Sequence, residues 1–235
     1  PYDIVLEKQP GAVAGDCTGE AAAYDIGNSF FALRATSAAV VGCITDAMPY
    51  TDVLVIKNAG SSPLSGGWSS QQTYVIAGRV SFELRDGADM PLDIGESYVA
   101  YPYRLQIYYI RKGATPTLSR KILAWDAVTE SMAIQTEDLV QGVENMRFRF
   151  GYHSNDDGEV DTLAYLDDIT AWDQVTSLQV FLLLASDVID PNYTNEKTYQ
   201  LGDIAVSPED SVRRILLHSD VKLRNRRLAW RRGGQ

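Results

Sequence analysis

An acidic segment near the middle of the chain is the part of the sequence that most resembles a metal site. Residues 155–161 read NDDGEVD and offer side-chain oxygens from Asn155, Asp156, Asp157, Glu159 and Asp161. Such oxygens are the ligands that Ca²⁺ prefers, but an EF-hand loop needs carboxylates at its first and twelfth positions. Aligning the glycine of that loop with Gly158 puts His153 and Ala164 at those positions. We therefore favour a turn between two strands over an irregular calcium cage.

Two histidines, His153 and His218, are the only imidazole groups in the chain that could serve as general bases. Neither follows a motif that pairs it with a nucleophile, and the sequence contains no GxSxG, HExxH or Walker glycine loop. Carboxylates are numerous, but no pair is marked out for glycoside hydrolysis. We interpret both histidines as solvated surface groups. The sequence predicts no catalytic residue, no cofactor and no resident metal.

Positive charge is concentrated at the end of an acidic chain. The net charge of the whole sequence is −10, whereas residues 211–235 hold eight basic residues and one acid, a net charge of +7. The arginines follow an alternating strand pattern, and Trp230 is the only aromatic residue near them. This favours self-complementarity or docking of a protein partner over a nucleic-acid surface. The candidate partner-binding residues are Arg214, Lys222, Arg224 and Arg226.

Strand patterns dominate the chain from residue 51 onward, and no segment has the periodicity of a long helix. We expect one globular domain over 1–235, with an irregular N-terminal segment at 1–50, a β-rich core at 51–226 and a tail at 227–235. A short helical turn is predicted at 169–175. The predicted strands cover 30–35, 52–59, 73–87 (one strand or a hairpin that turns at Gly78), 97–112, 118–126, 143–152, 177–186 and 211–226.

Two of these strands carry specific predictions about their faces. Residues 177–186 are apolar on both faces, as expected of a central strand that is covered on each side. The last strand, 211–226, alternates between aliphatic and basic residues. Its predicted inward residues are Ile215, Leu217, Val221 and Leu223. Its predicted outward residues are Arg214, His218, Lys222, Arg224 and Arg226, and their like charges discourage edge-to-edge pairing.

The two cysteines, Cys17 and Cys43, leave two alternatives open. They are free thiols in a reducing compartment and a disulfide in an oxidising one. No CxxC motif is present, which argues against a redox or zinc role. The longest apolar run, VFLLLA at 180–185, is too short to cross a membrane as a helix.

Several segments, taken in order, resemble the PilW-type minor pilins of type IV pili. The segment at 137–161 contains the run GVENMRFRFGY followed by the acidic turn. The matching segments are TDVLVIKNAG (51–60), YRLQIYYIRKG (103–113), TPTLSRKIL (115–123), EDLVQGVENMRFRFGYHSNDDGEVD (137–161), AWDQVTSLQVFLLLAS (171–186), TYQLGD (198–203) and RRILLHSDVKLRNR (213–226).

The resemblance implies an α+β fold that is mainly antiparallel β, similar to the globular domains of type IV pilins and J-type pseudopilins. Such pilins begin with a basic leader, a peptidase site and a long hydrophobic helix. This chain opens without those features, and we expect it to be the globular region with the N-terminal helix removed.

The resemblance also implies a function. It predicts a non-enzymatic subunit that joins other minor pilins in the complex that primes pilus assembly and lies at the pilus tip. The implied partners are other minor pilins and the major pilin, with the inner membrane reached only through the missing helix. The implied location is the inner membrane and periplasm, then the cell exterior. That location is oxidising, which favours a disulfide between Cys17 and Cys43.

Three alternatives remain at this stage, the last of which is an unrecognised hydrolase whose activity would depend on His153 or His218. A J-type pseudopilin of type II secretion would show a similar strand order and would form a comparable tip complex. An extracellular adhesin or carbohydrate-binding module is the second, in which exposed aromatic residues such as Trp68 or Tyr108 would stack on sugars.

Overall fold

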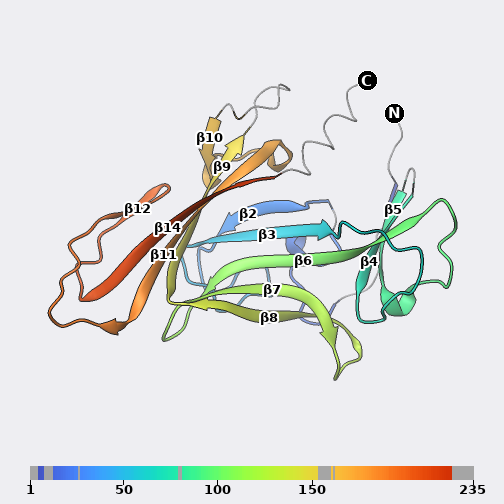
Figure 1. Cartoon of the computed structure of the whole chain (residues 1–235), viewed down its shortest axis with the longest axis horizontal. Coiled ribbons are helices and arrows are strands. Elements are labelled where there is room, and N and C mark those ends of the chain that lie inside the picture. Colours follow the sequence, from blue (N-terminus) through green and yellow to red (C-terminus); the bar gives the residue numbers. More distant parts are fainter. Residues whose placement is uncertain are drawn as a thin grey trace.

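Antiparallel strands in two packed sheets make up most of the chain in the computed structural model (Figure 1). The structure describes residues 5–7, 13–25, 27–78, 81–152, 160 and 162–223. Within these residues the only helices are four 3-10 turns of three residues each: η1 Gly19–Ala21, η2 Gly87–Asp89, η3 Leu166–Asp168 and η4 Trp172–Gln174. The α+β prediction was therefore wrong, because the described fold is nearly all antiparallel β. Alternating residues and frequent Gly and Pro breakers leave no described segment with the apolar spacing of an α-helix.

The first sheet takes its strands from the N-terminal part of the chain. Its order is β1-β5-β4-β6-β3-β2, with β7 added beside β6 and β8 beside β7. Among the described strands of this sheet, only β1 and β5 pair in parallel. Its strands are β1 Val5–Glu7, β2 Phe30–Arg34, β3 Asp52–Ala59, β4 Thr73–Ala77, β5 Ser81–Asp86, β6 Val99–Arg111, β7 Thr117–Asp126 and β8 Ser131–Gln141.

The second sheet follows in sequence and has the order β10-β9-β11-β14. A separate hairpin, β12–β13, lies in the connection between β11 and β14. The strands are β9 Val143–Tyr152, β10 Thr162–Tyr165, β11 Val175–Ile189, β12 Tyr199–Leu201, β13 Ile204–Val206 and β14 Val212–Lys222.

Gly142 is the corner at which the chain leaves the first sheet and enters the second. It stands alone between β8 and β9 and has a φ of 81°, in the left-handed region that favours glycine. Its N–H donates to the carbonyl of Pro116, and its carbonyl accepts from the N–H of Ala185. A Cβ at this position would lie 2.8 Å from the carbonyl oxygen of Ala185. The close approach of β11 and the left-handed φ both require glycine here.

Two apolar cores hold the layers together. The first lies between one face of the first sheet and the irregular segments on either side of β2, from Val13 to Tyr24 and from Ala35 to Ala47. The second lies between the sheets, where Phe30, Leu54 and Ile110 meet side chains of β9. The β9 members of this core are Val143, Met146, Phe148 and Phe150. The irregular N-terminal segment is therefore one wall of a core.

A disulfide joins Cys17 to Cys43, as the resemblance implied. It closes a loop of 26 residues within the N-terminal layer, and Cys17 is itself buried in the first core. Lys57 on β3 adds a second tie to this layer. Its Nζ donates to the carbonyl of Glu20 at 2.5 Å and to that of Asp25.

Most of the predicted strands are present. The bounds of β3 and β9 match the predictions of 52–59 and 143–152, and 73–87 is a hairpin rather than one strand. The strand predicted at 177–186 is β11, which lies between β9 and β14 with apolar clusters on both faces.

Candidate interaction surface

The strand at the edge of the second sheet, β14, displays a row of aliphatic side chains. Ile215, Leu217 and Val221 are exposed, with 57%, 45% and 42% of their surface accessible. They stand opposite Leu184, Leu182 and Leu178 of β11. The prediction that these three residues point inward to a covered core was therefore wrong.

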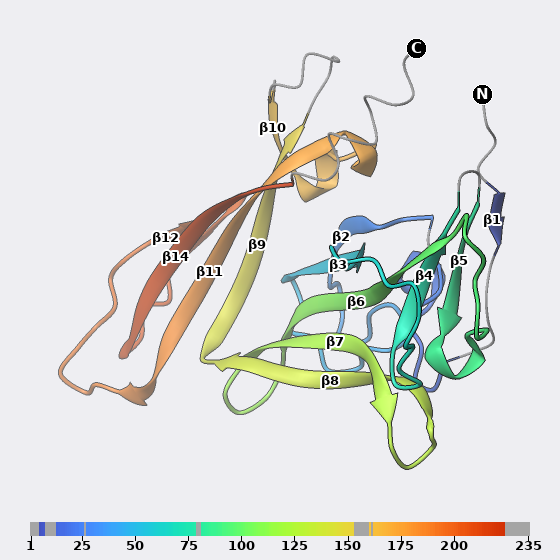
Figure 2. The same ribbon diagram turned by 45° about the vertical axis from the view of Figure 1, so that its right-hand side comes forward.

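The position of β14 explains this exposure. Within the second sheet, β9 is the strand that makes the main contacts with β3, β6 and β7 of the first sheet. Figure 2 shows β9 nearest to the first sheet, β11 next and β14 farthest away. The apolar face is thus covered at β9, half-buried along β11 and open at β14. An exposed aliphatic row on an edge strand is a common mark of an interaction surface.

Arg214 has an environment that differs from the predicted one. Its side chain is only 7% exposed, and it forms ion pairs with Glu144 on β9 at 2.5 Å and with Asp210 at 2.6 Å. These two carboxylates raise the pKa of Arg214 above its usual range. The predicted outward orientation of Arg214 was wrong. Asp210, which precedes β14, and Glu144 of β9 cover the face of the sheet to which the Arg214 side chain points. Glu144 could not be found from the sequence, because it is 70 residues away, whereas Asp210 is only four residues from Arg214.

The remaining candidate cations differ in their accessibility. Lys222 is exposed at the end of β14. Arg224 and Arg226 lie outside the residues that the structure describes. His218 is exposed on the same strand and stacks on Phe181 of β11, with ring centroids 4.7 Å apart. Its Nε2 lies 3.7 Å from a carboxylate oxygen of Asp220.

A buried charge cluster joins the two sheets but leaves little surface for a partner. Asp52, at the start of β3, is fully buried and contacts Arg34 at 3.0 Å and Arg147 of β9 at 3.3 Å. Burial raises the pKa of Asp52, and the backbone N–H of Phe148 and the two guanidinium groups oppose that shift. Asp203, in the turn between β12 and β13, contacts Arg34 at 3.0 Å. The cluster ties β2, β3, β9 and the hairpin together.

Lys57 is the buried ionisable group that most resembles a reactive one. It is 6% exposed, and burial lowers its pKa to about 8. A lowered lysine pKa is typical of catalytic amines, but both described acceptors of the Lys57 Nζ are main-chain carbonyls. We interpret Lys57 as a structural tie.

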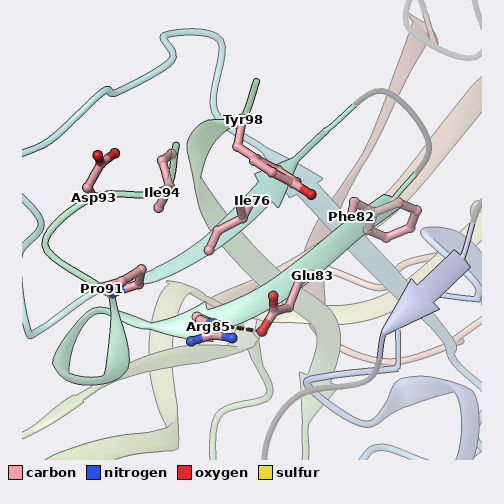
Figure 3. A pocket seen from close by; sticks show the side chains of 8 residues that line it. All are labelled: Ile76, Phe82, Glu83, Arg85, Pro91, Asp93, Ile94 and Tyr98. Atoms are coloured by element: carbon pink, nitrogen blue, oxygen red, sulfur yellow. Dashed lines mark hydrogen bonds and ion pairs between the residues drawn. The ribbon is translucent and has the colours of Figure 1, made fainter. Parts of the chain in front are cut away.

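The surface hollow shown in Figure 3 has a volume of about 410 Å³. Its charged residues are engaged within the chain, because Glu83 pairs with Arg85 and Asp93 accepts from the N–H of Gly95. No nucleophile in it is paired with a base. Its lining residues are Ile76, Phe82, Glu83, Arg85, Pro91, Asp93, Ile94 and Tyr98.

The aromatic residues suggested for sugar stacking are not open platforms. Trp68 is half-buried, packs edge-on against Tyr74 and donates its Nε1–H to the carbonyl of Pro91. Tyr108 is half-buried in the interior of β6.

The acidic turn at 155–161 and His153 lie outside the described residues, apart from Val160. Among the residues that are described, no group of three His, Cys, Asp or Glu could hold a metal ion. Within the same residues, no helix has the length and apolar character needed to span a membrane.

Comparison with known families gives one match. The sequence model of type IV pilus-assembly protein W matches residues 107–225, just over half of the chain. The match begins within β6 and ends after β14, so it contains the whole second sheet and the β12–β13 hairpin. No curated protein and no solved structure matches the chain.

Proposed function

Because the chain belongs to the family of type IV pilus-assembly protein W, we propose that it is a minor pilin that helps to prime pilus assembly. In this proposal it is a structural subunit, without a reaction of its own, that joins other minor pilins and the major pilin at the pilus tip. Family membership itself associates the chain with pilus assembly, with other pilus components and with the cell envelope.

The observation that carries the proposal is the open face of β14 within the matched region. Ile215, Leu217 and Val221 extend an apolar face that the first sheet covers only at β9. Burying aliphatic side chains contributes about 25 cal/mol for each Å² removed from water. A subunit that covers this face would therefore gain stability that the isolated chain lacks. Lys222 beside it supplies a charge that can orient a partner.

Binding to other pilin domains tests the proposal directly. We expect the chain to retain the globular domain of a minor pilin in a pull-down, and Ile215→Lys to weaken that binding. Leu92→Lys is a matched control, because Leu92 is fully exposed on a different part of the surface. Equal binding by both variants and the unchanged chain would contradict the role of β14.

Deletion of the gene separates the proposal from its alternatives. We expect loss of surface pili, restored by the unchanged gene and not by the Ile215→Lys form. Loss of secreted enzymes with normal pili would instead indicate a pseudopilin of type II secretion. Normal pili and secretion together with glycan binding would indicate an adhesin.

A further inference from the structure

The outer edge of β14 carries a row of main-chain groups that have no partner within the part of the chain that the structure describes. Odd-numbered residues of this strand pair with β11, as shown by the N–H of Leu223, which donates to the carbonyl of Thr176. Alternate residues of a strand turn their N–H and C=O to opposite sides. The N–H and C=O groups of Leu216, His218, Asp220 and Lys222 therefore point away from β11, and no described residue pairs with them.

This open edge has a defined beginning. Upstream, the carbonyls of Val212 and Arg214 point the same way, but each accepts a hydrogen bond from a side chain. Asn195 Nδ2 donates to the first at 3.0 Å, and the hydroxyl of Tyr199 donates to the second at 3.2 Å. The unpaired stretch thus starts at Leu216 and runs to Lys222, and every residue from Leu217 to Lys222 is exposed. Its midpoint is Ser219.

We propose that this edge pairs with the same edge of a second copy of the chain, antiparallel, about a two-fold axis at Ser219. In this register Leu216 stands opposite Lys222 of the second copy, and His218 stands opposite Asp220. These are the residues whose main-chain groups point outward, so they form the hydrogen-bonded pairs of an antiparallel ladder. The two four-stranded sheets become one continuous sheet.

Like charges on this strand were expected to discourage edge-to-edge pairing, but Arg214 is paired within the chain with Glu144 and Asp210. Most of the side chains that remain in the unpaired stretch are complementary in this register. His218 of each copy faces the carboxylate of Asp220 in the other, and this pairing occurs twice. Leu217 faces Val221, an aliphatic cross-strand pair that also occurs twice. Ser219 faces itself, and its small side chain fits the close approach at the axis. Each face of the joined sheet thus contains one complementary pair that occurs twice. Leu216 faces Lys222, of which only the alkyl stem offers an apolar contact.

The neighbouring two-fold register uses less of the open edge. An axis at His218 would place His218 opposite itself, Leu216 opposite Asp220, and Lys222 opposite Arg214, whose main-chain carbonyl already accepts from the hydroxyl of Tyr199. The axis at Ser219 uses the whole unpaired stretch.

The dimer is expected to be weak and reversible, because one strand pair buries less area than a standard interface of about 1,600 Å². The pairing is isologous, so it closes after two copies and does not form a filament. Pairing through the edge of β14 also leaves the apolar face of that strand uncovered. In the dimer, the apolar faces of the two copies lie side by side. The inference does not depend on pilus assembly, since the purified chain alone can be tested.

Cysteine cross-linking tests the register. Residues in a non-hydrogen-bonded pair have Cα atoms about 4.5 Å apart, close enough for a disulfide. Under a mild oxidant, Ser219→Cys should form covalent dimers rapidly. Leu217→Cys and Val221→Cys, exposed on the same strand, should each do so at least tenfold more slowly, and the double variant should regain the fast rate. Equal rates for the three single variants would overturn the proposal.

Charge exchange provides an independent test by sedimentation velocity. His218→Glu and Asp220→Lys should each weaken dimerisation about tenfold, and the double variant should restore it. His218→Pro removes an outward N–H together with the imidazole that stacks on Phe181. Because proline is tolerated on an edge strand, this variant should abolish the dimer and retain the fold by circular dichroism. A chain that stays monomeric up to near-millimolar concentration overturns the proposal. The proposal is also overturned if the edge of β14 binds another pilin but does not bind a second copy of the chain.

Discussion

The main-chain N–H of Phe148 on β9 donates a 2.9 Å hydrogen bond to the buried carboxylate of Asp52 at the start of β3. Arg147, the residue before Phe148, contacts the same carboxylate with its guanidinium group. One acidic side chain of the first sheet thus satisfies both a backbone donor and a charge of the second sheet. The packing of the two sheets is fixed by this polar contact as well as by the apolar core around it.

Asp52→Asn should destabilise the fold strongly. The amide retains an acceptor for the N–H of Phe148, but it leaves Arg147, which is 4% exposed, without its main counter-charge. Breaking a buried ion pair by removing one partner costs about 3 kcal/mol or more. Urea denaturation measures this loss. The control is Asp190→Asn, whose partner Arg213 is largely exposed, and it should change stability little. Similar losses in the two variants would show that the cluster is not structural.

Gly142→Ala should also be costly, because two effects coincide at this corner. A left-handed conformation costs an alanine about 1 kcal/mol, and the new Cβ would lie 2.8 Å from the carbonyl oxygen of Ala185. We expect a loss of about 2–3 kcal/mol in the free energy of unfolding. Gly67→Ala is the matched control, since Gly67 has a φ of 72° with no atom near its Cβ position. It should show only the conformational cost of about 1 kcal/mol.

Replacement of Cys17 and Cys43 by serine should lower stability by about 3 kcal/mol, because the disulfide restricts the unfolded chain over a loop of 26 residues. The loss should be matched by adding a reductant to the unchanged protein. Denaturation in urea with and without reductant measures both effects. Equal stability in the two conditions would mean that the apolar core alone orders the N-terminal layer.

Lys57 should make stability rise with pH between pH 7 and pH 9. Burial lowers its pKa from 10.5 to about 8, so the unfolded state binds more protons than the folded state in this range. Stability therefore increases as pH rises, by about 1.4 kcal/mol between pH 7 and pH 9. Lys57→Met should lose this increase, and the exposed control Lys222→Met should keep it. Denaturation curves at each pH measure the difference.

The upper pH limit of that measurement follows from the buried tyrosines. Burial raises the pKa values of Tyr24, Tyr103 and Tyr109 above 10.0. Above that pH the unfolded tyrosines release protons that the folded ones retain, so stability falls as pH rises. A flat profile for the unchanged protein between pH 7 and pH 9 would contradict the assignment to Lys57.

Charge reversal should separate Arg214 from Lys222. Arg214→Glu places a third carboxylate beside Glu144 and Asp210, and should lower the melting temperature markedly. Lys222→Glu should change stability by less than about 0.5 kcal/mol while weakening binding to a pilin partner. We expect Arg224 and Arg226 to behave like Lys222. A large loss of stability in Lys222→Glu would assign a structural role to that residue.

The sequence predicted the positions of the strands better than it predicted which face of each strand is covered. A short apolar run located β3 and alternation located β9, both to the residue. The same alternation predicted the wrong faces for β14. Periodicity shows that Ile215, Leu217 and Val221 share a face, but only the tertiary arrangement determines whether a layer covers that face.

The charged residues were the least predictable part of the candidate surface. Arg214 looked like a surface cation in its own strand, and its buried state depends on Glu144, 70 residues away. The disulfide was foreseen through the implied compartment, since the residues alone left free thiols open. The helical contribution to the fold was expected from family resemblance, and no described segment has the pattern to provide it.

The segment that defines the family begins upstream of the corner at Gly142, within β6, and is shorter than the segment needed for folding. A fragment that consists of residues 107–225 would retain the second sheet but would lack β2, β3 and most of β6. The excised piece would lack Asp52, Phe30 and Leu54, so Arg147 and the β9 core would face water. An expression fragment cut to those limits should therefore aggregate. The shortest soluble version of this protein should begin upstream of Cys17, although the family signature begins at residue 107.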